Sequence, residues 1–351
     1  MYKTNPPLLL DLDETLADQE NLEDLCADRP LRTTEIFQPN AFYGIDNILK
    51  TYAGLPRCYA LKAVVPHGIY LSKTYVWDAE QTASLPMVFC PPLRQQIYID
   101  QIKKFVVPSA APFLYVKELL KDYPHPKRQG TIFFLSHSTH YMTTKADFEQ
   151  LAEQLSSLES EYQPVTVCIY WKDYLLGHHI PFQNRGMRII SAGHIFDSHF
   201  LFRLYHLCSQ YHYSCSNNIG SHLFYSVKAG CSFFFIEGDY TYNVIPNSFG
   251  IKTEPRFIET ETEFKELFRQ PHRIMTEKQQ NIIDDYLGIT FFQSQQGLLN
   301  QIILAEALDK VGFVKCNGIK LDNPYFFQRL EKLPSRIVGK GKRWFAMLHI
   351  L

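Results

Sequence analysis

Short apolar segments alternate with segments of helical spacing between residues 131 and 237, and this alternation constrains the fold more than any other feature of the sequence. The apolar segments predict strands at 131–136, 165–171, 188–192, 212–216 and 232–237. The segments between them predict helices at 145–162, 199–211 and 221–228. Strands and helices that alternate over short connections are typical of a parallel sheet with both faces covered.

The rest of the chain has a less regular pattern. It predicts strands at 8–10, 59–65 and 87–90 and helices at 113–121, 263–269, 276–286 and 295–311. The stretch 122–130, which contains two prolines and a glycine, predicts a linker. We therefore expect an α/β protein with two Rossmann-like lobes that face a central cleft. The predicted divisions are an N-terminal lobe at 1–122, a C-terminal ligand-binding lobe at 123–290 and a helical C-terminal segment at 291–351.

Charge and composition narrow the function classes. The 35 Lys and Arg residues nearly balance the 36 Asp and Glu residues, which excludes a strongly basic nucleic-acid-binding protein. The first 25 residues are acidic where a secretory signal would be basic and then apolar, and no run of 18 apolar residues is present. Eight cysteines without C-x-x-C spacing predict free thiols and a cytoplasmic location, and we expect no metal site and no cofactor.

Polar side chains follow four of the predicted strands in the C-terminal lobe. Because the carboxyl ends of parallel strands share one edge, these side chains are expected to meet there and bind a ligand. The candidate ligand-binding residues are His137, Ser138, Tyr170, Lys172, Asp173, His194, Ser216, Asn217, Gly220 and Ser221. The segment before the helix at 221–228 is the strongest signal, since the N-terminus of a helix attracts anions. The alternative for this segment is simple helix capping.

Two residues of the N-terminal lobe are candidate general bases. His67 follows the strand predicted at 59–65, and Glu80 lies a little further along the chain. Either side chain could take a proton from a substrate hydroxyl in the cleft. The alternative for each is a structural or surface role.

Several motifs resemble those of GT-B-fold glycosyltransferase-like proteins from bacterial capsule and exopolysaccharide loci. In the N-terminal lobe the resemblance rests on 43–46 (YGID) with Leu49 and Lys50, on 66–68 (PHG), and on Trp77 and Glu80. In the C-terminal lobe it rests on 134–138 (FLSHS), 167–173 (VCIYWKD), 192–194 (AGH) with Asp197, and 216–222 (SNNIGSH). The similarity covers roughly residues 40 to 290. Bacterial sialyltransferases and Kdo transferases are similar more distantly, although they usually have His-Pro where this chain has His137-Ser138.

The resemblance implies a metal-independent glycosyltransferase of surface polysaccharide synthesis. Such an enzyme moves a sugar from a nucleotide-sugar donor, CMP- or UDP-linked, to a glycan or lipid-linked acceptor. His67 or Glu80 would be the base, and the ten strand-end residues would bind the donor. His137 with Ser138, and the segment 216–221, would then hold the phosphate and sugar.

Two other function classes stay open. Residues 8–16 (LLLDLDETL) fit the first motif of haloacid-dehalogenase-like phosphatases, in which Asp11 would be the nucleophile, Asp13 the acid/base and Mg²⁺ the phosphate-binding ion. Ser136, Lys228 and Asp239 would supply the remaining motifs. The third class is a non-catalytic, GT-B-like partner subunit of a two-subunit transferase.

The C-terminal tail 332–351 combines basic residues with an aromatic and apolar end. The cations are Lys332, Arg336, Lys340, Lys342 and Arg343, and Trp344 and Phe345 follow them. This pattern favours peripheral attachment to the anionic inner-membrane surface. The alternative is a last helix that packs on the protein with a solvated basic face.

Overall fold

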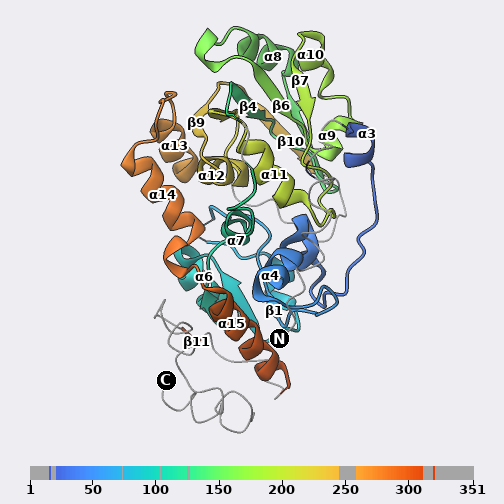
Figure 1. The fold of residues 1–351 in the computed structure, drawn as a ribbon, viewed down its shortest axis with the longest axis vertical. Helices are drawn as coiled ribbons and strands as arrows, with labels where there is room; N and C mark the ends of the chain where they lie inside the picture. Colours follow the sequence, from blue (N-terminus) through green and yellow to red (C-terminus); the bar gives the residue numbers. More distant parts are fainter. Residues whose placement is uncertain are drawn as a thin grey trace.

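A computed structural model of the chain describes residues 16, 21–72, 74–102, 104–124, 127–244, 258–310 and 319–320. Within these residues the protein is an α/β fold with two parallel sheets and one antiparallel strand pair. Figure 1 shows the sheet formed by residues 131–235 in the upper half of the molecule and the other parallel sheet in the lower half.

The upper sheet, called sheet B, has the strand order β7-β6-β4-β8-β9, and every neighbouring pair is parallel. Its strands are β4 (Thr131–Phe134), β6 (Val165–Cys168), β7 (Arg188–Ile190), β8 (Tyr213–Ser216) and β9 (Ser232–Phe235). The sequence predicted all five strands, although most end a few residues earlier than expected. Strand β6 ends because Trp171 begins the short helix α9.

The lower sheet, called sheet A, has the order β1-β2-β3-β11 and is also parallel. Its strands are β1 (Ala63–Val64), β2 (Met87–Cys90), β3 (Phe105–Pro108) and β11 (Ile319–Lys320). Strand β11 lies in the part of the chain that was predicted to be helical, and β3 was not predicted. The strand predicted at 8–10 falls outside the described residues.

Helices cover the faces of both sheets. In chain order, the first six described helices are α3 (Leu22–Leu25), α4 (Ile45–Ala53), α5 (Asp78–Thr82), α6 (Gln95–Gln101), α7 (Pro112–Leu119) and α8 (Phe148–Ser156). Further along they are α9 (Trp171–Leu175), α10 (Ile180–Asn184), α11 (Phe200–Cys208), α12 (Ser221–Lys228), α13 (Ile258–Leu267), α14 (Glu277–Leu287) and α15 (Gln295–Lys310). The short 3₁₀ segments are Gln38–Gly44, Pro92–Arg94, Ser160–Tyr162 and Ile289–Phe291.

The helix predicted at 145–162 begins later than expected. Asp147 accepts a hydrogen bond from the backbone N–H of Gln150 and so caps α8, which starts at Phe148. The residues before the cap form β5 (Met142–Ala146), which pairs antiparallel with β10 (Tyr240–Val244). The partner of β5 is almost a hundred residues away in the sequence, so no local pattern could predict this pair.

Successive side chains of each strand in sheet B point to opposite faces of the sheet, so they belong to two different apolar clusters. Phe133, Val167 and Cys215 face α8 and α10 in one cluster. Ile132 and Phe134 face α11 and α12 in the other. Strands buried on both faces explain the continuous apolar runs in the sequence.

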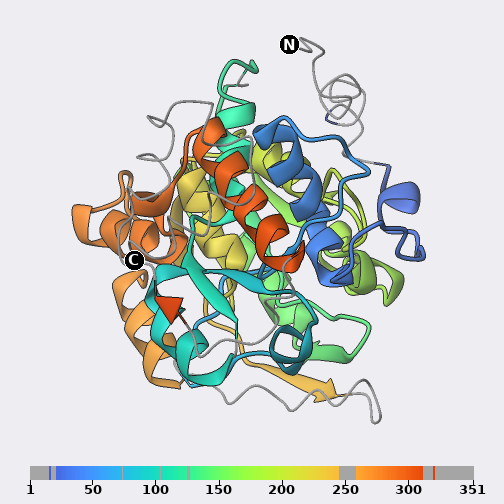
Figure 2. The ribbon, with the colours of Figure 1, turned by 90° about the horizontal axis from the view of Figure 1, so that it is seen from below.

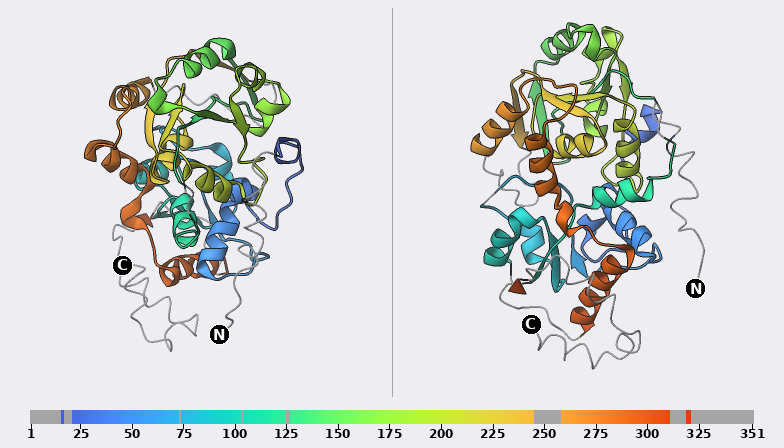
Figure 3. Two further views of the ribbon diagram at one scale, coloured as in Figure 1. Left: turned by 45° about the horizontal axis from the view of Figure 1, so that its top comes forward. Right: turned by 60° about the vertical axis from the view of Figure 1, so that its left-hand side comes forward.

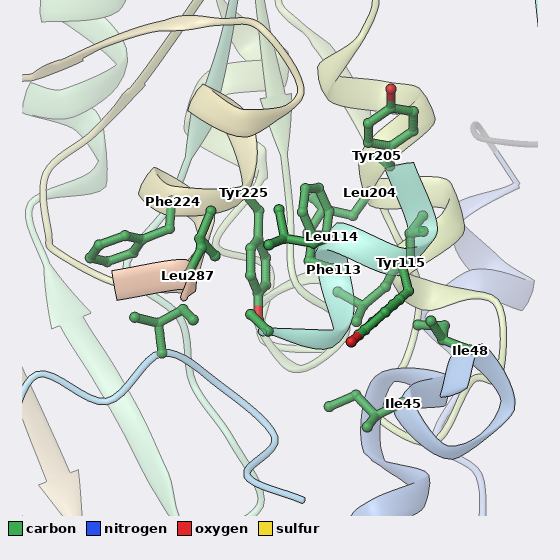
Figure 4. Packing of buried hydrophobic residues seen from close by; sticks show 14 of the residues in the cluster. Ile45, Ile48, Phe113, Leu114, Tyr115, Leu204, Tyr205, Phe224, Tyr225 and Leu287 are labelled. Carbon is green, nitrogen blue, oxygen red and sulfur yellow. The ribbon is translucent and has the colours of Figure 1, made fainter. Parts of the chain in front are cut away.

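The second of these clusters continues from sheet B into sheet A without a break. It includes residues of α4, α7, α11 and α12, which lie between the two sheets (Figure 4). The ring of Phe113 in α7 stacks on that of Tyr225 in α12, with 4.3 Å between the centroids. Figure 2, a view from below, and Figure 3 show α15 against α4 on the sheet A side.

Helix α3 lies within the predicted N-terminal lobe 1–122 but packs beside sheet B. Its neighbour Cys26 is fully buried in the cluster formed with α8 and α10, and Leu22 packs against that cluster. Residue Phe37, eleven positions on, is buried against the outer face of sheet A. The segment therefore crosses from one sheet to the other, as the blue trace in Figure 1 shows. The domain divisions drawn from the sequence stay a prediction.

Candidate functional site

The candidate site lies at the carboxyl edge of sheet B, where neighbouring strands bring the predicted residues into a row. His194 follows β7, Tyr170 follows β6, His137 follows β4 and Asn217 follows β8. The ring centroids of His137 and Tyr170 are 4.7 Å apart. The row is the arrangement that the strand-end pattern predicted.

Four of the predicted ligand residues, all of them buried, use their side chains to hold the strand ends of sheet B. The Asp173 carboxylate, fully buried, accepts hydrogen bonds from the Ser138 hydroxyl at 2.7 Å and from the Ser138 backbone N–H, and it lies 2.9 Å from Nδ1 of His178. The Asn217 amide oxygen accepts the Ser136 N–H at 3.2 Å. Buried backbone groups at the ends of strands need such partners.

Ser216 also forms hydrogen bonds with groups at the strand ends. Its hydroxyl donates to the Phe134 carbonyl at 2.7 Å and lies 2.9 Å from the Asn218 side chain. Ser138, Asp173, Ser216 and Asn217 thus hold the strand ends in register. Of the other six predicted binding residues, His194 is buried. The remaining five, which are partly exposed, are His137, Tyr170, Lys172, Gly220 and Ser221.

The start of α12 lies against the loop that follows β1 in sheet A. The Ser221 hydroxyl accepts the Ile69 N–H at 2.9 Å. A Cβ atom on Gly68 would lie 3.2 Å from the same hydroxyl oxygen. The two sheets therefore meet at the helix N-terminus that the sequence marked as an anion site.

His67, in that same loop, joins the row through Tyr43. The Tyr43 and Tyr170 hydroxyl oxygens are 3.3 Å apart, and the rings of Tyr43 and His67 are stacked with 6.3 Å between the centroids. The Tyr70 hydroxyl lies 3.1 Å from Nδ1 of His67. Trp77 and Phe42 contact the His67 ring edge-on.

The imidazoles of this site are uncharged near neutral pH. Burial lowers the pKa of His67 to about 4 and that of His222 to about 3, and it also lowers the pKa of His137. A neutral imidazole can accept a proton or form a hydrogen bond with a ligand. Lys172 supplies a positive charge nearby, with its ammonium 5.4 Å from the centroid of the Trp171 ring.

Glu80 does not join the row. Its side chain is buried, and it accepts a hydrogen bond of 2.6 Å from the Tyr98 hydroxyl. Tyr98 belongs to the cluster on the face of sheet A formed by Val64, Val88 and Val106. Trp77, whose ring contacts His67, packs against this same cluster, so what separates Glu80 from His67 is its buried hydrogen bond to Tyr98.

His194 is in the row, but its neighbours shield it from solvent. Its ring is fully buried, 4.2 Å from the Trp171 ring, and its Nδ1 accepts the Phe196 N–H at 3.1 Å. Burial lowers its pKa to about 4.

Sequence reasoning missed two residues of the site. Tyr43 has a positive φ of 59°, and its N–H donates to the Ile195 carbonyl, which fixes the ring between His67 and Tyr170. His222 stacks on Phe134 with 5.3 Å between the centroids. Both lie inside motifs noted in the sequence, but no spacing rule distinguishes them from capping or core residues.

Of the residues assigned to a phosphatase, Lys228 lies apart from Ser136 in the described part of the chain. Lys228 lies at the C-terminal end of α12 and pairs with Asp284 at 2.5 Å. Ser136 follows β4 and Asp239 follows β9, both at the carboxyl edge of sheet B, whereas the end of α12 lies at the other edge. Asp11, Asp13 and the basic tail 332–351 lie outside the described residues.

A small apolar cavity of about 30 Å³ lies at the carboxyl edge of sheet A. Phe89, Tyr115 and Tyr225 are among its lining residues. It has room for about one water molecule, so it is not a substrate pocket as it stands.

No protein-family model, curated protein sequence or solved structure matches this chain. Within the described residues, no helix is both long enough and apolar enough to cross a bilayer.

Proposed function

We propose that the protein is a glycosyltransferase that takes a sugar from a nucleotide-sugar donor. The observation that carries the proposal is the meeting of three features at one place: the His137–Tyr170 pair, the N-terminus of α12, and the His67 loop of sheet A. A donor needs a site for its phosphate and flat surfaces for its rings, and an acceptor hydroxyl needs a base.

The donor phosphate would bind at the start of α12. Backbone N–H groups and the helix dipole stabilise negative charge there, and that charge grows as the sugar leaves. His137 follows β4, the neighbour of the strand β8 that leads to α12, and Lys172 follows β6 on the far side of β4. The Ile69–Ser221 hydrogen bond closes this helix start, so binding would open that contact.

His67 is the base that we assign, in preference to Glu80. Burial lowers its pKa to about 4, so the imidazole is neutral at physiological pH and its basic nitrogen carries no proton before the acceptor binds. Glu80 is bonded to Tyr98 among residues on one face of sheet A. A proton taken from the acceptor hydroxyl would reside on His67 while the oxygen attacks the anomeric carbon and the nucleotide departs with the bonding electrons.

We extend the proposal to the whole architecture. Sheets A and B would be the two Rossmann-like lobes of a GT-B-like enzyme, with the donor bound to sheet B and a glycan or lipid-linked acceptor on the sheet A side. The enzyme would act without a metal in bacterial surface polysaccharide synthesis, in the cytoplasm. The tail 332–351 would hold it to the inner membrane.

A donor-consumption assay tests the proposal. The protein is incubated with CMP-, UDP-, GDP- and TDP-sugars in the presence of a chelator, and nucleotide release is measured with and without mixed glycan acceptors. We expect one donor class to be consumed, and we expect His67→Ala to lower the rate by about 100-fold or more, since base catalysis contributes at least that much. The control is His212→Gln, at an exposed histidine that immediately precedes β8.

The other two function classes predict different results. Binding of a nucleotide sugar without consumption by any acceptor would favour the partner subunit. Hydrolysis of phosphate esters that requires Mg²⁺ and is lost in Asp11→Asn would favour the phosphatase. If the protein neither binds nor consumes any of the four donors, the proposal is contradicted.

A further inference from the structure

The segment 21–29, which we call the N-terminal strap, is held against sheet B by contacts at both of its ends. Near its start, Leu22 and Cys26 pack into the cluster beneath α8 and α10. At its end, Asp28 lies beside two histidines that follow strands of sheet B, and Arg29 lies 3.7 Å from Asp197. Figure 1 shows α3 next to α9 at this edge.

The donor atoms of Asp28, His140 and His194 converge on one point. Asp28 Oδ1 lies 3.5 Å from Nε2 of His194 and 3.9 Å from Nε2 of His140, and the three ligand atoms all lie within 4.8 Å of one another. The His194 ring is fully buried, and its Nε2 has no hydrogen-bond partner within normal distance. Burial of a polar atom without a partner is costly, so such an atom points to a missing ligand.

We propose that Asp28, His140 and His194 bind a divalent transition metal, with zinc the best fit, and that this ion fastens the N-terminal strap to sheet B. Two imidazoles and a carboxylate form a donor set that zinc accepts, and water completes its coordination. Ligand atoms on a tetrahedral zinc ion lie roughly 3.3 Å apart. The exposed Asp28 and partly exposed His140 can close the remaining gap, because only His194 is fixed in the core.

The surroundings of the cluster define how the ion would bind. Nδ1 of His194 accepts the Phe196 N–H, so the ring proton lies on Nε2 and faces Asp28. The metal replaces this proton, the ring then carries its proton on Nδ1, and the Phe196 contact opens. Because this proton stays on the same ring, neutral imidazoles bind the ion without net proton release, and binding weakens when the pH falls far enough to protonate them.

Two cations near the cluster oppose a metal ion. Arg29 lies close to His194, and Lys172 lies close to His140. Arg29 faces Asp197, which also pairs with Arg203 at 2.5 Å, so part of its charge is compensated. The site has a single carboxylate of its own, Asp28, and we therefore expect reversible binding that a strong chelator removes.

Zinc titration of the full-length protein tests the inference, and it does not depend on the proposed transferase activity. The protein is treated with chelator, dialysed in reducing buffer and titrated with ZnSO₄ by calorimetry. We expect one equivalent to bind, and we expect affinity to fall by at least about 10-fold in Asp28→Asn and in His140→Gln. Both residues are at least partly exposed, so these variants should fold.

Two controls address zinc bound elsewhere. His212→Gln removes an exposed histidine outside the cluster, and Cys58→Ser removes an exposed free thiol. Both should bind zinc as the wild type does. In hydrogen exchange, zinc should slow the amides of residues 21–29 in the wild type but not in Asp28→Asn. Absence of stoichiometric binding, or equal binding by Asp28→Asn and His140→Gln, would overturn the site.

Discussion

Gly44 shows how tightly the two halves of the molecule meet at the level of a single residue. Its φ is +76°, and a Cβ atom there would lie 2.0 Å from the Ser198 carbonyl oxygen in the loop after β7. The preceding residue, Tyr43, bonds through its N–H to Ile195 in the same loop. No side chain can replace the hydrogen of Gly44 without moving this backbone.

We predict that Gly44→Ala destabilises the protein more than Gly186→Ala does. Gly186 has nearly the same φ, +75°, but a Cβ atom there would meet nothing within 4 Å, so its substitution carries only the backbone penalty of about 1–2 kcal/mol. Gly44→Ala adds a clash worth about 1–3 kcal/mol more. Urea unfolding of the two variants measures the difference, and equal losses would show that the Ser198 contact is absent.

Buried neutral histidines predict how stability changes with pH. The pKa values of His67 and His194 are about 4 and that of His222 is about 3, against 6.5 for an unfolded histidine, because burial disfavours the charged form. The unfolded chain therefore binds more protons below pH 6.5. Stability is full above pH 6.5 and falls toward pH 4, by up to about 1.4 kcal/mol per pH unit for each group.

Urea unfolding at several pH values between these limits measures this slope. His222→Gln removes one titrating group and should make the slope shallower. A stability that rises as the pH falls through this range would contradict the burial of these rings.

The sequence predicted where the polar residues of the site lie but not what each one does. Strand-end position was enough to bring together His137, Tyr170 and Asn217. It could not distinguish a partly exposed His137 from a buried Asn217 that bonds to Ser136, since both types follow strands and both can bind ligands. That distinction depends on contacts between strands far apart in the sequence.

At the scale of elements, α4 contains a buried ion network that links it to sheet A. Lys50 is fully buried and lies 2.5 Å from Glu35 and 2.7 Å from Asp46. Glu35 also accepts the N–H of Leu61, two residues before β1. The motif that contributed to the resemblance, 43–46 followed by Lys50, thus has a structural role at its Asp46 and Lys50 positions.

We predict that Lys50→Met costs about 3–5 kcal/mol of stability, because it leaves two buried carboxylates without their cation. The matched control is Lys121→Met, which breaks the exposed pair with Glu118 and should cost less than about 1 kcal/mol. Chemical denaturation compares the two. Equal effects would show that Lys50 is solvated.

Periodicity predicted the elements that are buried on defined faces and missed those that are not. The five strands of sheet B and helices α12, α14 and α15 follow from apolar spacing. Strand β5 alternates no apolar residues, because it is a partly exposed ribbon paired only with β10. The strand β3 was hidden because a Pro ends it and an apolar helix pattern begins four residues later.

At the scale of the whole molecule, one apolar cluster joins both parallel sheets through α7. Figure 4 shows Phe113, Leu114 and Tyr115 of this helix among residues of α4, α11 and α12. The sheets therefore share buried surface and should not unfold independently.

We predict a single cooperative unfolding transition for the described halves of the protein. Phe113→Ala, which opens a cavity between the sheets, should lower stability by about 3–5 kcal/mol and loosen that coupling. Calorimetry measures the number of unfolding transitions. Hydrogen exchange of amides in β2 reports on sheet A, and that of amides in β6 reports on sheet B. Two separate transitions in the wild type would contradict a continuous core.

The proposed donor site is tested most directly by nucleotide binding. CMP, UDP, GDP and TDP are titrated by calorimetry into the wild type, His137→Ala, Ser221→Ala and the control His212→Gln. We expect one nucleotide to bind the wild type and the control equally, and to bind the two site variants at least about 10-fold more weakly, the effect of losing about 1.4 kcal/mol of contact. Binding of none of the four, or equal binding by all four proteins, would contradict a donor site at the carboxyl edge of sheet B.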